Sequence, residues 1–268
     1  MTPIVFATDY SPIAQNAVIY AAELAKYLEV ELEIIHAYVF PFAYTDSPVP
    51  LLNVEEIQNI AETSMQAELK RVQAAFPTLK ITSRILPGEI IDCLVEVVEA
   101  KSPLMIVMGT SGTGSGSFLW GSAAVKALRT LTIPVLAVAS DIIWKPIRNI
   151  CFAADYEQIS ESTPFEKVID WVERLKARLF IVHVENQNSI TEIPALLEQK
   201  LQALQPTYHS IVNENMVEGI NEYIQEKQVD WLVVVPKKYG FLENLFHKSR
   251  TKILAQGSNV PVLAFHHD

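Results

Sequence analysis

Apolar positions follow two different periods along the first half of this chain. Short unbroken apolar runs predict buried strands, and longer segments with apolar residues three or four positions apart predict amphipathic helices. The expected strands are residues 4–7, 32–38, 82–86, 104–108 and 134–139, and the expected helices are residues 12–28, 54–76, 89–99 and 123–129. Strands that are apolar on both faces and alternate with helices form a parallel sheet covered by helices. The pattern therefore predicts a doubly wound α/β fold.

The second half of the chain repeats the first. Three segments match in the same order: residues 3–10 with 147–156, 32–37 with 179–184, and 134–138 with 261–265. In the first pair, Asp9 aligns with Asp155. The repeat predicts two tandem domains of this fold, residues 1–144 and 145–268, here called the first and second halves. Because an apolar edge strand needs a partner, we expect the last strands of the two halves to pair within the chain as an intramolecular pseudo-dimer, and a homodimer of whole chains stays open.

Composition narrows the class of protein. The chain has 268 residues, 50% of them hydrophobic, and a formal net charge of −10, which argues against a general nucleic-acid surface. No apolar stretch approaches the roughly 18 to 20 residues of a membrane span, and the N-terminus enters a predicted strand directly. Cys93 and Cys151 have no metal-ligand or CxxC spacing and are expected to be buried apolar residues. We expect a cytoplasmic protein that binds neither membrane nor nucleic acid.

A glycine-rich segment follows the fourth predicted strand. Residues 108–117 are MGTSGTGSGS, and Gly121 and Ser122 precede the next predicted helix. Glycines permit positive φ and close backbone approach, and the free N–H groups of a helix N-terminus attract an anion. The segment is a candidate phosphate site, with a flexible surface loop as the alternative. In a doubly wound sheet Asp9 and Gly109, at the ends of the first and fourth strands, would open into one crevice.

These motifs resemble those of universal stress proteins of the UspA type. The resemblance rests on residues 8–11 (TDYS), 35–37 (IHA), 87–88 (PG), 107–112 (VMGTSG), 121–122 (GS) and 133–138 (IPVLAV). Since it covers both halves, it implies a tandem-domain member with Rossmann-like, adenine nucleotide alpha hydrolase-like domains. Nucleotide-binding members carry Gly-x2-Gly-x9-Gly-Ser/Thr, whereas this chain has Gly109-x2-Gly112-x8-Gly121-Ser122, one residue shorter. Gly114 or Gly116 would absorb the deletion.

The resemblance implies that the first half binds ATP or another adenine nucleotide, with or without Mg²⁺. The implied binding residues are Ala7, Thr8, Asp9, Ala37, Met108, Gly109, Ser111, Gly112, Gly121, Ser122 and Ala123. Asp9 and the backbone of Ala37 would meet the adenine, and the glycines with Ser122 and Ala123 would hold ribose and phosphates. A purely structural alternative for Asp9 is the N-cap of the helix that begins at Pro12.

The second half lacks this glycine pattern. Aligning the closing strands places Pro236, Tyr239 and Lys248 opposite Gly109, Gly112 and Gly121, so we do not expect this half to bind ATP in the same manner. The substituted loop is basic instead, and it either contacts an anion or acidic partner or is a solvated turn. Its basic residues are Lys237, Lys238, His247, Lys248 and Arg250.

Three functional hypotheses follow. The first is a stress-response sensor or regulator that binds an adenine nucleotide, the second a nucleotide-independent scaffold for a protein or an apolar ligand, and the third a slow nucleotide hydrolase. The sequence contains no Walker lysine, nucleophile elbow or metal-binding motif, so no catalytic or metal-binding residue is assigned and enzymatic activity is the weaker hypothesis.

His36 and His183 occupy matching strand positions and are expected to pair with core groups. The Pro- and aromatic-rich insert 39–52 is a lid over the base, a partner surface or a packed segment.

Overall fold

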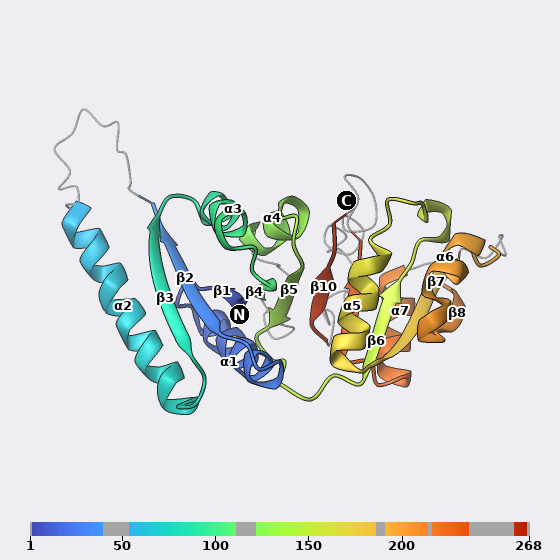
Figure 1. The fold of residues 1–268 in the computed structure, drawn as a ribbon, viewed down its shortest axis with the longest axis horizontal. Coiled ribbons are helices and arrows are strands. Elements are labelled where there is room, and N and C mark those ends of the chain that lie inside the picture. Colours follow the sequence, from blue (N-terminus) through green and yellow to red (C-terminus); the bar gives the residue numbers. More distant parts are fainter. Residues whose placement is uncertain are drawn as a thin grey trace.

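The computed structural model describes residues 2–39, 54–110, 122–185, 191–213, 216–235 and 260–266. Within them, ten strands form one sheet in the order β3-β2-β1-β4-β5-β10-β9-β6-β7-β8 (Figure 1). The strands of the first half are β1 (Ile4–Ala7), β2 (Leu32–Tyr38), β3 (Ile81–Pro87), β4 (Met105–Thr110) and β5 (Val135–Ala139). Those of the second half are β6 (Asn149–Ala153), β7 (Arg178–Glu185), β8 (Thr207–Val212), β9 (Trp231–Val234) and β10 (Val262–Ala264).

Helices separate most successive strands. They are α1 (Pro12–Tyr27), α2 (Val54–Ala75), α3 (Ile90–Lys101), α4 (Ser122–Thr130), α5 (Phe165–Leu175), α6 (Ala195–Leu201) and α7 (Met216–Glu226). The predicted doubly wound α/β fold is confirmed, and the element bounds of the first half differ from the predicted ones by at most two residues. Two ends shift by two residues: α3 continues to Lys101, and β4 continues to Thr110 because that buried residue still pairs with Ala139.

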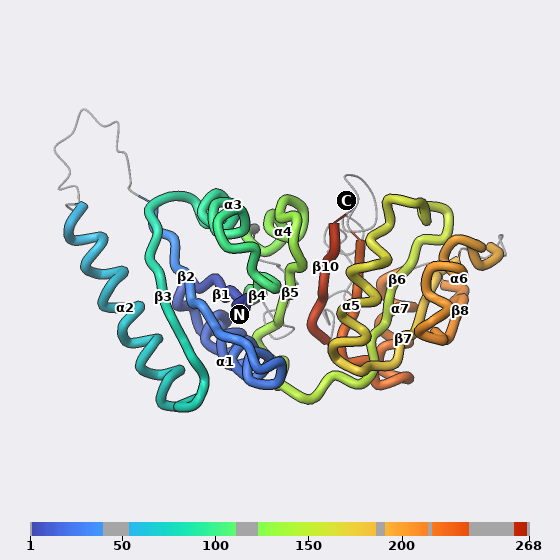
Figure 2. The backbone as a smooth tube through the Cα atoms, in the orientation of Figure 1, coloured from blue at the N-terminus to red at the C-terminus, as the bar shows by residue number. Residues whose placement is uncertain are grey.

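The sheet separates two apolar layers, because side chains alternate between the faces of a strand. In β1, Ile4 and Phe6 belong to one layer and Val5 and Ala7 to the other. Helices α1, α2, α5 and α6 contribute to the first layer, and α3, α4 and α7 to the second. Figure 2 shows α3 and α4 side by side, and the two helices contact each other. Both cysteines are buried as predicted.

The two halves join through their closing strands. Strand β5 pairs with β10 in antiparallel register, with Leu136 opposite Leu263, whereas all other strand pairs are parallel. Figure 1 shows these strands next to each other in the middle of the sheet. Every residue of both strands is buried. The predicted pairing within the chain is confirmed, and it removes an apolar edge that would otherwise expose unpaired backbone groups.

Each half repeats one strand order. The first half runs β3-β2-β1-β4-β5 and the second runs β8-β7-β6-β9-β10, so the order reverses next to β1 and next to β6. In open α/β sheets a ligand crevice lies outside the carboxyl ends of the strands at such a reversal. Among the helices in the described part of the chain, none is long and apolar enough to cross a bilayer.

Candidate functional site

A cavity of about 370 Å³ opens at the carboxyl ends of β1 and β4, where the strand order reverses. Seven predicted binding residues line it: Ala7, Thr8, Asp9, Ala37, Met108, Gly109 and Ala123. Three others, Ser111, Gly112 and Gly121, lie outside the described residues, and only the backbone of Ser122 is described, at the start of α4. The crevice expected between Asp9 and Gly109 is therefore present.

The cavity has further walls that the sequence analysis did not assign. They are formed by Ser11, Ile13, Ala14, Val39, Gly88, Glu89, Ile90 and Ala124. Gly88 was the available signal, because it follows Pro87 directly after a predicted strand. Its φ of +130° suits glycine, and its N–H donates to the carbonyl oxygen of Tyr38 over 2.9 Å. This turn aims the start of α3 at the cavity.

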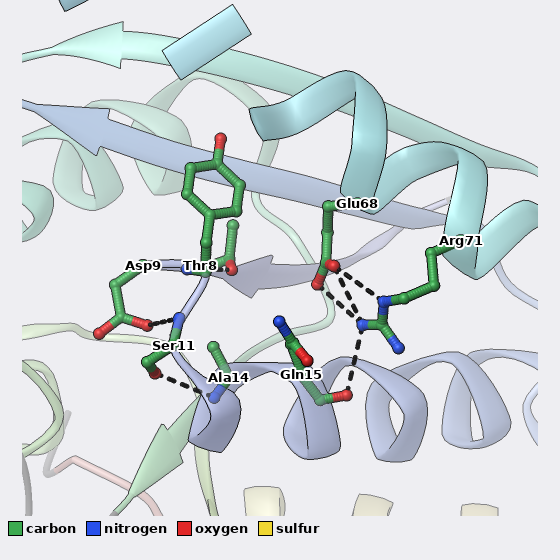
Figure 3. A network of polar contacts seen from close by, with 8 residues as sticks. Thr8, Asp9, Ser11, Ala14, Gln15, Glu68 and Arg71 are labelled. Atoms are coloured by element: carbon green, nitrogen blue, oxygen red, sulfur yellow. Dashed lines mark hydrogen bonds and ion pairs between the residues drawn. The ribbon is translucent and has the colours of Figure 1, made fainter. Parts of the chain in front are cut away.

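Asp9 shapes the turn that leads from β1 into α1. Its Oδ1 accepts a hydrogen bond of 3.0 Å from the N–H of Ser11, and its other oxygen points away from this network (Figure 3). The N-cap of α1 is Ser11, whose Oγ accepts from the N–H of Ala14 over 3.2 Å. The alternative prediction that Asp9 caps this helix was wrong, because the shorter serine side chain sits directly before Pro12 and reaches the first turn.

His36 fixes the same turn from the neighbouring strand. Its Nδ1 hydrogen-bonds the carbonyl oxygen of Thr8 over 2.8 Å, and its ring lies 4.3 Å from the ring of Tyr10. Tyr10 has a φ of 61°, its N–H donates to Thr8 Oγ1 over 3.0 Å, and its hydroxyl donates to the carbonyl oxygen of Ala61 in α2. Burial, with the nearby charge of Glu68, raises the pKa of Tyr10. The structural role predicted for His36 is confirmed.

The second half places an aspartate, an aromatic residue and a histidine at the matching turn, although there Tyr156 begins a short 3-10 helix whereas Tyr10 has a positive φ. His183 Nδ1 lies 3.0 Å from the carbonyl oxygen of Ala154, and its ring stacks on Tyr156 at 4.2 Å with an interplanar angle of 7°. Asp155 Oδ1 accepts from the N–H of Glu157 over 3.2 Å, as Asp9 does from Ser11. The repeat seen in the sequence thus extends to the contacts of the matching aspartate and histidine, whereas the tyrosine N–H donates to Thr8 Oγ1 in the first half and to His183 Nδ1 in the second.

A smaller cavity of about 170 Å³ occupies the matching place in the second half. Glu157 and Val184 stand there where the first half has Ser11 and Ala37, so the walls are bulkier and more acidic. Glu185, which is buried, also lines this cavity and accepts a hydrogen bond from the N–H of Thr191 over 3.1 Å. The loop of residues 237–250, predicted to replace the glycine-rich segment, lies outside the described residues.

Gly109 allows helix α1 to approach β4 closely. A Cβ atom at this position would lie 3.2 Å from Ile13 Cγ2 and 3.3 Å from the Ile13 carbonyl oxygen. Because the second contact is with backbone, a larger residue would displace the start of α1. Gly109 therefore has a packing role in addition to lining the cavity.

Three helices begin at the cavity of the first half. The start of α1 contributes Ser11, Ile13 and Ala14 to its walls. The start of α3 contributes Glu89 and Ile90, and the start of α4 contributes Ala123 and Ala124. The N-cap of α3 is Glu89, and its side chain makes no capping hydrogen bond. First-turn N–H groups and the helix dipole favour a negative group at such a place. The geometry thus suits a ligand that carries an anion at one end.

Comparison with known proteins decides the family. The model of the universal stress protein family matches residues 1–139. This chain belongs to the universal stress protein family. It is 32% identical to a universal stress protein of Methanocaldococcus jannaschii over 139 residues, which cover 50% of this chain and 80% of that one. It is also 30% identical to universal stress protein A homolog 1 of Coxiella burnetii over 139 residues, covering 50% of this chain and 94% of that one.

A solved universal stress protein resembles the whole chain. The crystal structure from Archaeoglobus fulgidus matches 99% of this chain and 98% of its own, with a TM-score of 0.71 and 16% sequence identity. At that identity the likeness concerns the fold. The universal stress protein described here therefore shares its two-part α/β architecture with a solved relative.

Proposed function

We propose that this universal stress protein binds an adenine nucleotide in the cavity of its first half and acts as a nucleotide-responsive sensor or regulator in stress response. The observation that carries the proposal is the convergence of Asp9, the small residue Ala37 and three helix N-termini on one cavity at the strand-order reversal. The free oxygen of Asp9 is able to accept a hydrogen bond from an exocyclic amine. The helix N-termini supply N–H donors for a phosphate.

The difference between the two cavities supports assigning binding to the first half. The cavity there has a volume of about 370 Å³, within the usual range of small-molecule sites, whereas the second measures about 170 Å³. The second also replaces Ser11 with a carboxylate, Glu157, which repels an anion. The first cavity is therefore the larger of the two and is lined by fewer carboxylates, so it suits an adenine nucleotide better than the second.

Paired substitutions in the two halves test the proposal. Asp9→Ala and Asp155→Ala each remove one turn hydrogen bond, of 3.0 Å and 3.2 Å, so they should lower the free energy of unfolding by similar amounts. Only Asp9→Ala should weaken nucleotide binding, by about tenfold or more, because a hydrogen bond to a charged acceptor contributes about 1.5 kcal/mol or more. The probes are AMP, cAMP and ATP, since universal stress proteins have been crystallised with cAMP and with AMP.

Isothermal titration calorimetry on the full chain measures the three affinities, and urea unfolding measures stability. Wild-type affinity in a folded Asp9→Ala variant, or loss of binding in Asp155→Ala, would contradict the assignment to the first half. A folded wild type that binds none of the three probes would contradict the function itself.

A further inference from the structure

Tyr10 has an unusual backbone conformation for its residue type. Its φ of 61° lies in the left-handed region, which residues other than glycine rarely adopt. Among the described residues, five other non-glycine residues have a positive φ, and each ends or follows a helix, where a left-handed residue is common. Tyr10 instead lies between a strand and the helix that follows it. Such a conformation persists only where surrounding contacts hold it.

Three contacts hold Tyr10 in place. Its N–H donates to Thr8 Oγ1 over 3.0 Å, its ring lies 4.3 Å from the ring of His36, and its hydroxyl donates to the carbonyl oxygen of Ala61 over 3.3 Å. Ala61 is buried on α2, 51 positions further along the chain. Helix α2 therefore anchors the far end of the tyrosine side chain.

Helix α2 is itself tied to α1. Glu68 is buried on α2 and forms an ion pair with Arg71, one turn later. Arg71 Nη2 also donates to the carbonyl oxygen of Gln15 on α1 over 3.4 Å (Figure 3). Because α2 contacts both the turn and α1, the position of α2 is coupled to the way the chain enters α1.

The left-handed turn at Tyr10 brings the start of α1 to the cavity. The N-cap of α1, Ser11, follows Tyr10 directly. Ser11, Ile13 and Ala14 all line the cavity. In the second half, Tyr156 begins a 3-10 helix and α5 starts well after it, and no residue of α5 is among the described residues that line the smaller cavity. The turn thus accounts for the wall that α1 gives to the first cavity.

We infer that Tyr10 is a positioning residue of this site: anchored on α2, it keeps the turn left-handed and so holds the start of α1 against the bound adenine nucleotide. The inference rests on the proposed function. Tyr10 itself is not among the described residues that line the cavity, and it packs in the layer of α1 and α2. It therefore acts on the ligand through Ser11 and Ile13. Relaxation to a negative φ would displace these walls and lower the apparent affinity in proportion to the molecules that relax.

Two substitutions at Tyr10 separate the backbone conformation from the side-chain contacts. Tyr10→Ala and Tyr10→Gly both lose the contacts with His36 and Ala61, but glycine adopts a positive φ about as readily as a negative one. In isothermal titration calorimetry on the full chain, Tyr10→Ala should weaken AMP binding by about fivefold or more, and Tyr10→Gly by about twofold. Equal AMP affinities in the two folded variants, or tighter binding by Tyr10→Ala, would overturn the inference, because a packing role alone does not favour glycine.

Tyr10→Phe keeps the ring and tests the anchor on α2. Loss of the hydrogen bond to Ala61 should weaken AMP binding by about twofold or more. Tyr156→Phe is the matched control: the buried Tyr156 hydroxyl has no hydrogen-bond partner among the described residues, so AMP affinity should equal that of the wild type.

Wild-type AMP affinity in Tyr10→Phe, or an equal loss in Tyr156→Phe, would overturn the role given to the anchor on α2. Urea unfolding of each variant shows whether a change in affinity occurs in folded protein. A folded wild type that binds none of AMP, cAMP and ATP would instead overturn the proposed function.

Discussion

The indole Nε1 of Trp231 donates a hydrogen bond of 2.7 Å to the hydroxyl oxygen of Tyr20. Tyr20 lies on α1 in the first half and Trp231 begins β9 in the second, and both are almost completely buried. Tyr20 also packs edge-on against Trp144, with ring centroids 5.1 Å apart. The two halves are thus joined by a buried polar contact in the apolar layer that contains α1, as well as by the pairing of β5 with β10.

Replacing Tyr20 with Phe should destabilise the whole chain. The substitution keeps the ring but leaves Trp231 Nε1 buried without its acceptor, which costs about 1–3 kcal/mol. Urea unfolding gives the change. Tyr27→Phe on the same helix is the matched control, because Tyr27 is 45% exposed and should lose little. Equal losses of unfolding free energy in the two variants would show that the buried hydrogen bond does not stabilise the fold.

Cutting the connection between the halves should not separate them. Ile143 is 83% exposed, so a protease recognition sequence inserted there should be accessible. The pairing of Leu136 with Leu263 and the contact of Tyr20 with Trp231 remain after cleavage. The fragments should co-elute in size-exclusion chromatography at the volume of the uncleaved chain. Fragments that elute separately under native conditions would refute a stable interface between the halves.

Gly109→Ala should affect both stability and ligand binding. The added Cβ would meet Ile13 Cγ2 at 3.2 Å and the Ile13 carbonyl oxygen at 3.3 Å, so α1 must shift by a few tenths of an ångström. Overpacking of this kind costs about 1–3 kcal/mol. Because Ser11 and Ile13 line the cavity, AMP affinity should fall as well.

A second substitution checks the cause of the Gly109→Ala effect. Adding Ile13→Ala removes the side-chain clash and leaves the backbone contact, so the penalty of Gly109→Ala should be smaller in the Ile13→Ala background. A double-mutant cycle by urea unfolding measures this coupling. Strict additivity would mean that Gly109 acts elsewhere than at the contact with α1.

Alkaline pH should destabilise the fold partly through Cys151. Burial raises the pKa of its thiol from 9.0 to about 12. Above pH 9 the unfolded chain loses this proton while the folded chain keeps it, so stability falls between pH 9 and 12, by about 1.4 kcal/mol per pH unit. Cys151→Ala should show a shallower decline in unfolding free energy between pH 8 and 11. Parallel pH profiles for wild type and variant would contradict a neutral buried thiol.

Much of the fold was predictable from the sequence because local patterns determine it. The strands β1 and β2 have the predicted bounds, since most of their residues are apolar and a strand between two helical layers is largely buried. The equivalence of Asp9 and Asp155 was also visible, and the two turns share a hydrogen-bonding pattern. The alternative that Asp9 is the N-cap was wrong, because Asp9 and Ser11 are both good capping residues and only the path of the turn distinguishes them.

The sequence by itself determined the alternation of strands and helices, the internal repeat and the part of the candidate site that follows β1 and β4. Each depends on a residue's type and its near neighbours along the chain. Only the tertiary structure decided that Glu89 faces the same cavity as Asp9, that Gly109 packs on Ile13, and that Tyr20 meets Trp231 across 211 positions. These contacts join segments that are distant in the sequence. Their geometry depends on how the helices pack on the sheet, and the local pattern of apolar residues does not specify that packing.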